Sequence, residues 1–206
     1  MVNFLLLFEK IIYYTKKDID KGLTPQKVYE LCSCIRETFC LSYSFRKNNN
    51  LHVYFQDAHF LISFLGNKLR YLGPDERSQA LLLLKALSLM RGRDDSKETN
   101  TMKSTPGIYV RRFLGDSSFI HYFKSIIEGN VHLIVDDIEP IKEDLVVIKE
   151  SDFYVIPTFT SSTEKSDLIH MFRQMKNINF LSLSKIKPIE NKILYINFQK
   201  DHQETL

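Results

Sequence analysis

The sequence predicts a single α/β domain whose mostly parallel sheet is flanked by helices. Short apolar runs alternate with segments in which apolar residues recur every three or four positions, as strands alternate with amphipathic helices. This rhythm is clearest between residues 131 and 198, where strand, helix and strand follow one another. The length of 206 residues suits one domain, and the chain contains neither an internal repeat nor a low-complexity tract.

Apolar runs rich in β-branched and aromatic residues predict the strands. In chain order they are residues 4–8, 51–55, 60–65, 108–110, 131–135, 153–156, 180–183 and 193–198. A short polar link around Asp57 joins the second run to the third, so these two strands are expected to form a hairpin.

Helical periodicity predicts four helices, each preceded by a residue that can cap its first turn. The expected caps are Thr24, Asp75, Asp116 and Ser161, the last in a capping box with Glu164. We expect the first helix to end near Cys40, the second near Gly92 and the third before Gly129. Segments 17–23 and 93–105 are polar and lack periodicity, which predicts a turn and a surface loop.

The composition is that of a globular protein. Hydrophobic residues make up 44% of the chain and charged residues 26%, which argues against disordered, collagen-like and disulfide-scaffold classes. No apolar run is long enough to span a membrane, and residues 1–8 have neither a basic start nor a cleavage site. The sequence therefore predicts a cytoplasmic protein, in which Cys32, Cys34 and Cys40 are reduced.

The charge is unevenly distributed along the chain. The net charge of +3 is too small to imply a polyanionic partner. Residues 1–130, however, contain 19 lysines and arginines against 13 acidic residues, whereas residues 131–152 contain 2 against 7. The first part could therefore face phosphates and the acidic stretch could not, although charge alone favours solvated faces without a partner.

The common enzyme motifs are absent. There is no dinucleotide-binding Gly-x-Gly-x-x-Gly, no Walker loop, no Gly-x-Ser-x-Gly and no His-Glu-x-x-His. Cys32 and Cys34 would point about 200° apart on a helix, which disfavours a shared metal. The six histidines lack ligand spacing, and Asp136 with Asp137 could bind a cation, act as a base or simply end a strand. The residues alone therefore predict no metal site, and no catalytic residue is assigned.

The segment from Ser104 to Arg112 is the most informative one. It contains a Thr-Pro-Gly turn, whose backbone amides could meet an anion, and an extended piece that ends in two arginines. This chemistry suits phosphate, and it suits equally a structural turn followed by a solvated arginine pair.

This segment resembles, letter for letter, the Ser-Thr-Pro-Gly-Ile-Tyr-Val-Arg-Arg signature of the archaeal tRNA pseudouridine-54 N1-methyltransferases. These enzymes belong to the SPOUT superfamily of trefoil-knotted methyltransferases. Four further matches occur in the family's order, from about residue 3 to about residue 200. They are Leu-Cys-Ser-Cys at 31–34, Phe-Arg-Lys at 45–47, Pro-Asp-Glu-Arg at 74–77 and Leu-Ser-Leu-Ser at 181–184.

The resemblance implies one SPOUT domain over residues 1–206, with a C-terminal trefoil knot, that acts as a homodimer. It implies transfer of the methyl group of S-adenosylmethionine to N1 of a pseudouridine in the T-loop of tRNA. The cofactor-binding residues that it implies are Ile134, Pro157, Leu181, Ser182, Leu183, Ser184, Lys185, Ile186 and Ile193. The RNA-binding residues are Arg46, Lys47, Arg77, Lys103, Arg111 and Arg112.

Some positions depart from the family pattern. Residues 156–161 contain no glycine where the family has a glycine-bearing loop, and Pro157 lacks the N–H that another residue would offer to a ligand. Lys185 replaces a proline, and residues 26–29 lack an aspartate that could face the substrate. These departures predict weakened binding of S-adenosylmethionine. They leave open an alternative, a non-catalytic SPOUT-fold protein that binds RNA and has a degraded cofactor pocket.

Overall fold

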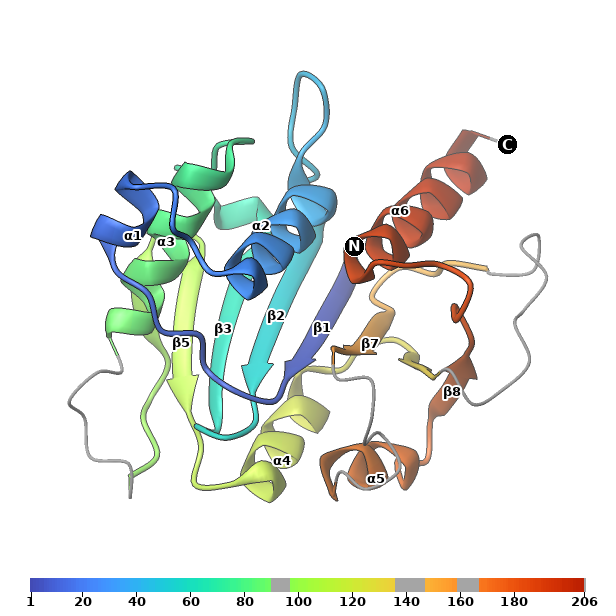
Figure 1. Ribbon diagram of the computed structural model, residues 1–206. Coiled ribbons are helices and arrows are strands. Elements are labelled where there is room, and N and C mark those ends of the chain that lie inside the picture. The colour runs from blue at the N-terminus through green and yellow to red at the C-terminus, as the bar shows by residue number, and fades with distance from the viewer. Residues whose placement is uncertain (90–96, 136–146, 159–166, 206) are drawn as a thin grey trace.

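The computed structural model describes residues 1–89, 97–135, 147–158 and 167–205. In it, eight strands form one sheet with helices on both faces (Figure 1). The strands are β1 (Val2–Phe8), β2 (Asn49–Phe55), β3 (Phe60–Leu65), β4 (Met102–Thr105), β5 (Ile108–Arg112), β6 (Val131–Ile134), β7 (Phe153–Pro157) and β8 (Ile178–Leu181). Their order across the sheet is β4-β5-β3-β2-β1-β7-β6-β8.

The sheet has a parallel and an antiparallel part. Strands β8, β6, β7, β1 and β2 pair in parallel. Strands β3, β5 and β4 extend the sheet by antiparallel pairing, beginning with the β2–β3 hairpin. The predicted α/β class, the mostly parallel sheet and this hairpin are therefore confirmed.

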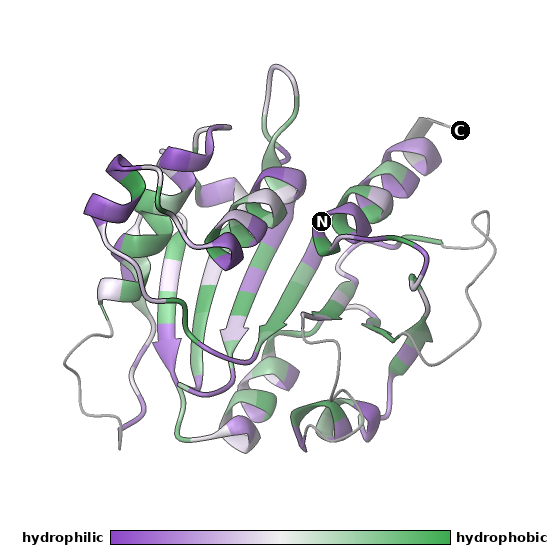
Figure 2. Cartoon of the chain, in the orientation of Figure 1, coloured by the Kyte–Doolittle hydropathy of each residue, from purple (hydrophilic) through white to green (hydrophobic). Residues whose placement is uncertain are grey.

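Strand β1 is the centre of the parallel part. All seven of its residues are buried, and it pairs in parallel with β2 on one side and β7 on the other. A strand that is covered on both faces reads as a continuous apolar run rather than an alternating one. Figure 2 shows this hydrophobic character along most of β1.

The helices divide between the two faces. They are α1 (Lys16–Asp20), α2 (Gln26–Phe39), the 3-10 helix η1 (Gly66–Lys68), α3 (Glu76–Ser88), α4 (Asp116–Ile126), α5 (Asp167–Arg173) and α6 (Ile189–Thr205). Helices α2, α3 and α6 pack on one face, where Leu31, Leu83 and Ile193 share a core cluster. Helices α4 and α5 pack on the other face, where Phe119 and Phe172 belong to a second cluster.

The predicted strand at residues 193–198 is wrong, because this run lies within helix α6. Ile193, Ile196 and Asn197 are buried, whereas the side chains of Leu194 and Phe198 are 45% and 63% exposed. Buried positions at 193, 196 and 197 recur at the spacing of one helix face. A short apolar run does not by itself distinguish a strand from such a helix. Packing of α6 against α2 decides the outcome.

Two further segments differ from the prediction. Residues 16–20 form helix α1, which a capping box between Thr15 and Asp18 starts, where a turn was expected. Residues 102–105 form strand β4, where a loop was expected. Both elements are too short to show a period, and β4 is polar in sequence and exists because it pairs with β5.

Two of the predicted caps are displaced. Pro25 rather than Thr24 stands at the N-cap of α2, and Gly115 rather than Asp116 at that of α4. Asp75 caps α3 as predicted, since its carboxylate accepts the N–H of Ser78. The predicted capping box of Ser161 and Glu164 lies outside the described residues, as does the pair Asp136 and Asp137.

A buried histidine lies within the sheet. His52 on β2 is 6% exposed, and its Nδ1 lies 2.9 Å from the hydroxyl oxygen of Ser63 on β3. Burial lowers the pKa of His52 from 6.5 to about 4, because the charged imidazolium would lose its hydration. The folded protein therefore keeps this side chain neutral at physiological pH.

We expect the stability of the protein to fall as the pH drops through the range between these two pKa values. The unfolded chain binds a proton at His52 near pH 6.5, whereas the folded chain resists protonation down to about pH 4. Stability is thus fully present above the first value and decreases towards the second, by up to roughly 3 kcal/mol. Urea unfolding across this range should show a smaller decrease for His52→Gln than for the wild type. His121→Gln, at an exposed position on α4, is the control. An unchanged pH dependence in His52→Gln would contradict the assignment.

Candidate functional site

The carboxyl ends of the parallel strands form the edge at which a ligand is expected. The chain that leaves β1 continues into α1 and α2 on one face of the sheet, whereas the helix that follows β7 in the chain, α5, packs on the other face. β1 and β7 are parallel neighbours, but the connection from β1 leads to β2 and that from β7 leads to β8, towards opposite edges of the sheet. Such a topological switch point is where open α/β sheets bind their ligands.

A cavity of about 750 Å³ lies at this switch point. The end of β1 at Phe8, the following segment to Tyr13, and Thr158 after β7 line it. The first turn of α2 completes the lining with Gln26 and Lys27. The N-cap of this helix is Pro25, and no side-chain hydrogen bond caps the first turn. Because this turn lines the cavity, the positive end of the helix dipole lies there.

The structure brings most of the predicted cofactor-binding residues to this same edge. Ile134, Pro157 and Leu181 lie at the carboxyl ends of β6, β7 and β8. Ile134, Leu181, Leu183 and Ile193 belong to one core cluster, against which Ile186 packs. Residues that are far apart in the sequence thus surround one end of the sheet.

The segment that follows β8 is held by its own backbone. The carbonyl oxygen of Leu181 accepts the N–H of Val135, and that of Leu183 accepts the N–H of Ile186. The hydroxyl of Ser182, which is buried, donates to the hydroxyl of Ser184. Lys185 alone among the predicted cofactor residues is exposed.

This edge offers a nucleoside cofactor only part of what it needs. Ile186 is partly exposed beside the loop after β8, whereas Ile134 and Ile193 are buried in the core. The carbonyl oxygens of Leu181 and Leu183 already accept backbone amides. The cavity at the switch point has a volume in the range of small-molecule sites. Pro157 offers no N–H, and Thr158 directs both its N–H and its hydroxyl to the carbonyl oxygen of Leu7.

The predicted RNA-binding residues do not form one cluster. Lys103 is paired across the sheet with Tyr109, and Arg111 follows two residues later on β5, so all three side chains share one face. Arg112 is buried and points to the other face. Arg77, on α3, forms an ion pair with Asp20 at 2.6 Å.

Arg46 and Lys47 lie at the opposite end of the sheet from Arg111. They precede β2, whose Asn50 pairs with Leu65 at one end of β3, whereas Arg111 pairs with Leu61 near the other end. The strand between these ends is roughly 15 Å long. Arg46 makes a bidentate contact with Asp201 of α6, at 2.6 and 2.7 Å.

The Thr-Pro-Gly turn is separated from the arginines in the same way. Pro106 and Gly107 form the two-residue loop between β4 and β5, at the amino end of β5. Arg111 and Arg112 end that strand at its other side. The turn and the arginine pair therefore cannot hold the same phosphate group.

A polar cluster that the sequence did not predict lies at the carboxyl end of β2. The carboxylate of Asp116 accepts hydrogen bonds from the hydroxyl of Tyr54 at 2.7 Å and from the amide of Gln56 at 2.9 Å. His59 Nδ1 lies 3.3 Å from the same carboxylate, and His59 has a positive φ of 47°. The contact with Asp116 engages one ring nitrogen and leaves Nε2 for another partner.

The cysteines belong neither to the cavity at the switch point nor to the polar cluster around Asp116. Cys32 and Cys34 are buried on α2 without a disulfide. Burial raises the pKa of Cys32 to about 12, so its thiol remains protonated. In the part of the chain that the structure describes, no three histidine, cysteine or acidic side chains are grouped as metal ligands, and no helix is both long and apolar enough to cross a membrane.

Fold and edge together define an α/β protein with a cavity of small-molecule size at the switch point of its parallel strands. The chain belongs to the family described as "Putative SAM-dependent RNA methyltransferase", whose profile matches residues 24–128, just over half of its length. The family resemblance predicted from the sequence motifs is thereby confirmed.

Several relatives that share one name are similar to this chain. The tRNA (pseudouridine(54)-N(1))-methyltransferase of Methanocaldococcus jannaschii is 33% identical over 116 residues, which are 53% of this chain and 55% of that protein. The enzyme of the same name from Haloferax volcanii is 37% identical over 82 residues, covering 40% of this chain and 39% of that protein. The chain thus matches about half, or less, of the length of these relatives.

A solved structure shares the whole fold. The crystal structure of Archaeoglobus fulgidus Nep1 bound to S-adenosylhomocysteine covers 100% of this chain, and this chain covers 99% of it, with a TM-score of 0.57 and 12% identity. The predicted fold class, an α/β fold with a mostly parallel sheet flanked by helices, is confirmed by this similarity.

Proposed function

We propose that this protein is an S-adenosylmethionine-dependent tRNA methyltransferase that modifies N1 of a pseudouridine in the T-loop. Membership of the RNA methyltransferase family carries the proposal, since its match includes the segment from Ser104 to Arg112. The names of the relatives supply the substrate, and the switch-point cavity supplies a place for the reaction.

The residues at the carboxyl edge would hold the cofactor. S-adenosylmethionine, when bound, supplies an activated methyl group. Ile134, Leu181 to Ile186 and Ile193 would surround its adenosine, with backbone groups on its polar atoms. The contribution of the protein is then chiefly to orient donor and acceptor and to exclude water.

Transfer to N1 requires that the N1 proton leave, and His59 is the candidate acceptor. In the tautomer whose Nδ1–H donates to Asp116, the Nε2 lone pair is left to accept a proton. His59 lies at the carboxyl end of β2, the strand next to β1, and thus at the edge of the sheet that bears the cavity.

A titration combined with a transfer assay tests the function. We expect calorimetry to detect S-adenosylmethionine binding, with a weaker affinity than a relative with a glycine-bearing loop shows, because Pro157 offers no N–H. We expect transfer of labelled methyl groups to tRNA that contains pseudouridine and none to tRNA in which uridine replaces it. Absence of cofactor binding at millimolar concentration would overturn the enzymatic assignment.

The alternative, an RNA-binding protein without methyl transfer, is favoured by one group of observations. Residues 156–161 contain no glycine, and the carbonyl oxygens of Leu181 and Leu183 already accept backbone amides. This alternative predicts that tRNA binds with no measurable heat from the cofactor. The same two measurements therefore decide between the candidates.

We propose that tRNA contacts the basic positions predicted from the motifs. Among them, Lys47 and Lys103 are exposed, whereas Arg112 is buried and Arg46 bonds to Asp201. Contacts of lysine with phosphate weaken as the salt concentration rises.

The double variant Lys47→Glu, Lys103→Glu should therefore bind tRNA at least ten-fold more weakly than the wild type, because two phosphate contacts are replaced by repulsion. Filter binding at fixed salt measures this affinity. The control is Lys85→Glu, Lys176→Glu, which changes the net charge equally at two other exposed lysines. Equal affinities of the two double variants would refute a specific role for Lys47 and Lys103.

We also propose that the protein is a homodimer with a C-terminal trefoil knot. The exposed side chains of Leu194 and Phe198 lie four residues apart on α6, so they form one apolar strip on the surface of that helix. A second copy of the chain would cover this strip across a two-fold axis.

A further inference from the structure

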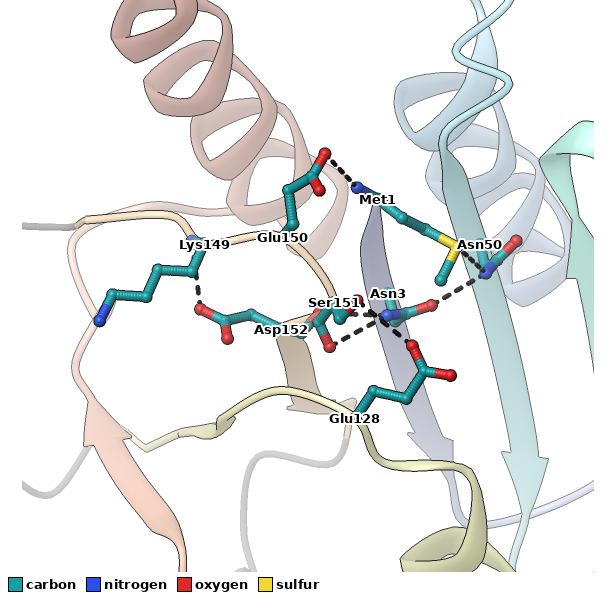
Figure 3. Close-up of polar contacts among 8 residues, drawn as sticks. All are labelled: Met1, Asn3, Asn50, Glu128, Lys149, Glu150, Ser151 and Asp152. Carbon is teal, nitrogen blue, oxygen red and sulfur yellow. Dashed lines mark hydrogen bonds and ion pairs between the residues drawn. The ribbon is translucent and has the colours of Figure 1, made fainter.

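A second cavity lies at the amino end of the sheet, opposite the edge that carries the proposed reaction. Its volume is about 380 Å³. Strands β2, β3 and β5 form its floor, and the end of α4 and the segment before β7 form its sides. Figure 3 shows the residues beside it, where Asn3 and Asn50 are hydrogen-bonded at 2.9 Å and Glu128 lies close to Ser151.

The floor of this cavity offers neutral hydrogen-bonding groups. His52 and Ser63 face one another across β2 and β3, and both line the cavity. The buried His52 ring is uncharged, and Ser63 occupies only its Nδ1. The Nε2 atom can donate or accept according to the tautomer that Ser63 selects. Such a pair suits the edge of an uncharged heterocycle better than it suits an anion.

The walls of the cavity are aromatic. Tyr109 on β5, Tyr122 on α4 and Phe153 on β7 line it. The guanidinium of Arg111 lies 4.5 Å from the centre of the Tyr122 ring and fixes that ring from one side. Flat aromatic walls with a small polar floor are the features that bind a base turned out of a nucleic acid.

The cavity lining includes one lysine, Lys68, and one carboxylate, that of Glu128, and further lysines lie near it. Lys68 is the last residue of η1 and is exposed. Its Nζ lies 5.8 Å from the centre of the Tyr109 ring. Lys103 lies directly opposite Tyr109 on β4 and is also exposed. Lys47 lies at the same end of the sheet as Lys68, since the carbonyl oxygen of Lys47 lies beside Gly66 at the start of η1. Phosphates on either side of a bound base would meet these lysines.

We propose that this cavity receives one unpaired base of RNA, in addition to the base that is methylated at the other edge. A cavity of about 150 Å³ accommodates a benzene ring, so the space present here suffices for a base with its ribose. The inference rests on the proposed RNA substrate for the source of the base. It requires neither the cofactor nor methyl transfer.

The experiment follows the ring signals of ¹⁵N-labelled histidine by NMR, in the absence of cofactor. His52→Gln assigns the signal of His52. The probes are uridine, cytidine, adenosine and guanosine, and short single-stranded oligoribonucleotides of each base. We expect at least one nucleoside to shift the His52 signal saturably, and the matching oligoribonucleotide to bind roughly ten-fold more tightly at low salt, because of its phosphates.

Two variants and a control complete the test. Ser63→Leu fills the cavity and Tyr109→Leu removes a wall, and each should weaken nucleoside binding about ten-fold. Tyr71→Leu, at a tyrosine that is 70% exposed and outside the cavity, should leave it unchanged. If Ser63→Leu does not fold, Tyr109→Leu alone decides.

Each outcome has a distinct meaning. A His52 signal that no nucleoside or oligoribonucleotide moves overturns the proposal, whatever the methyl transfer assay shows. Equal affinities for a nucleoside and its oligoribonucleotide would overturn RNA as the source and assign the cavity to free nucleosides. Base binding without any methyl transfer would support the cavity while the proposed enzymatic function fails.

Discussion

Gly107→Ala is expected to destabilise the protein by roughly 2–5 kcal/mol, from the cost of a left-handed backbone and of overpacking. Gly107 has a φ of 86°, which fits the second central position of a β-turn whose first central residue is Pro106. A Cβ at this position would lie 2.4 Å from the backbone nitrogen of Leu69 and 2.6 Å from its Cα. Backbone atoms cannot rotate away as a side chain can, so the β4–β5 hairpin or the segment after η1 must move.

Two other glycines separate the causes of this effect. Gly22 has a φ of 68° with no atom near its absent Cβ, so Gly22→Ala tests the backbone conformation alone. Gly115 has an extended backbone and equally open space, so Gly115→Ala should cost at most about 1 kcal/mol, from the poorer N-cap of α4. Denaturant unfolding of the three variants measures their free energies of unfolding, and we expect Gly107→Ala to be the least stable. A Gly107→Ala variant as stable as Gly22→Ala would show that contact with Leu69 is unimportant.

Asp152→Ala should cost about 3–5 kcal/mol, as expected when one partner is removed from a buried charged network. Asp152 is 1% exposed at the start of β7. Its carboxylate accepts the N–H and the side-chain amide of Asn130 at 2.9 and 3.1 Å, and the N–H of Lys149 at 3.2 Å. His132 Nε2 lies 3.1 Å from the same group. Alanine would leave these partly buried donors without their acceptor.

The control for this change is two residues away. Glu150 carries a side chain that is 83% exposed and contacts only the terminal amine of Met1 among the contacts drawn in Figure 3. A surface pair of this kind contributes at most about 1 kcal/mol. Thermal unfolding should therefore separate Asp152→Ala widely from Glu150→Ala. Similar melting temperatures would mean that the donors around Asp152 find water instead.

The strands were predictable wherever burial on both faces produced a continuous apolar run. This holds for β1, for β7 and for the β2–β3 hairpin. Helix α6 was mistaken for a strand because its buried residues Ile193 and Ile196 lie in a run too short to show its period. Strand β4 has no apolar pattern of its own, since its partner β5 determines its conformation.

The site was predictable only in part, and for a related reason. The motifs of the family identified residues of the carboxyl edge, and the fold brings these together around Ile134 and Leu181. No local pattern indicates that Asp116 accepts hydrogen bonds from Tyr54 and Gln56, which lie 62 and 60 residues earlier, or that His52 lines a cavity with Tyr122. Such groupings arise from strand order, which the sequence does not display.

The position of β1 at the centre of the sheet has a consequence for how the chain acquires its structure during synthesis. Leu7 is paired with Pro157, so one edge of this wholly buried strand has no partner until about 150 further residues have been made. At the usual rates of translation that interval lasts roughly 10–30 s. Throughout it, an apolar strand edge is open to other chains, and pairing across so long a separation is slow even afterwards. The nascent chain therefore exposes this apolar edge to other chains well before its sheet is complete.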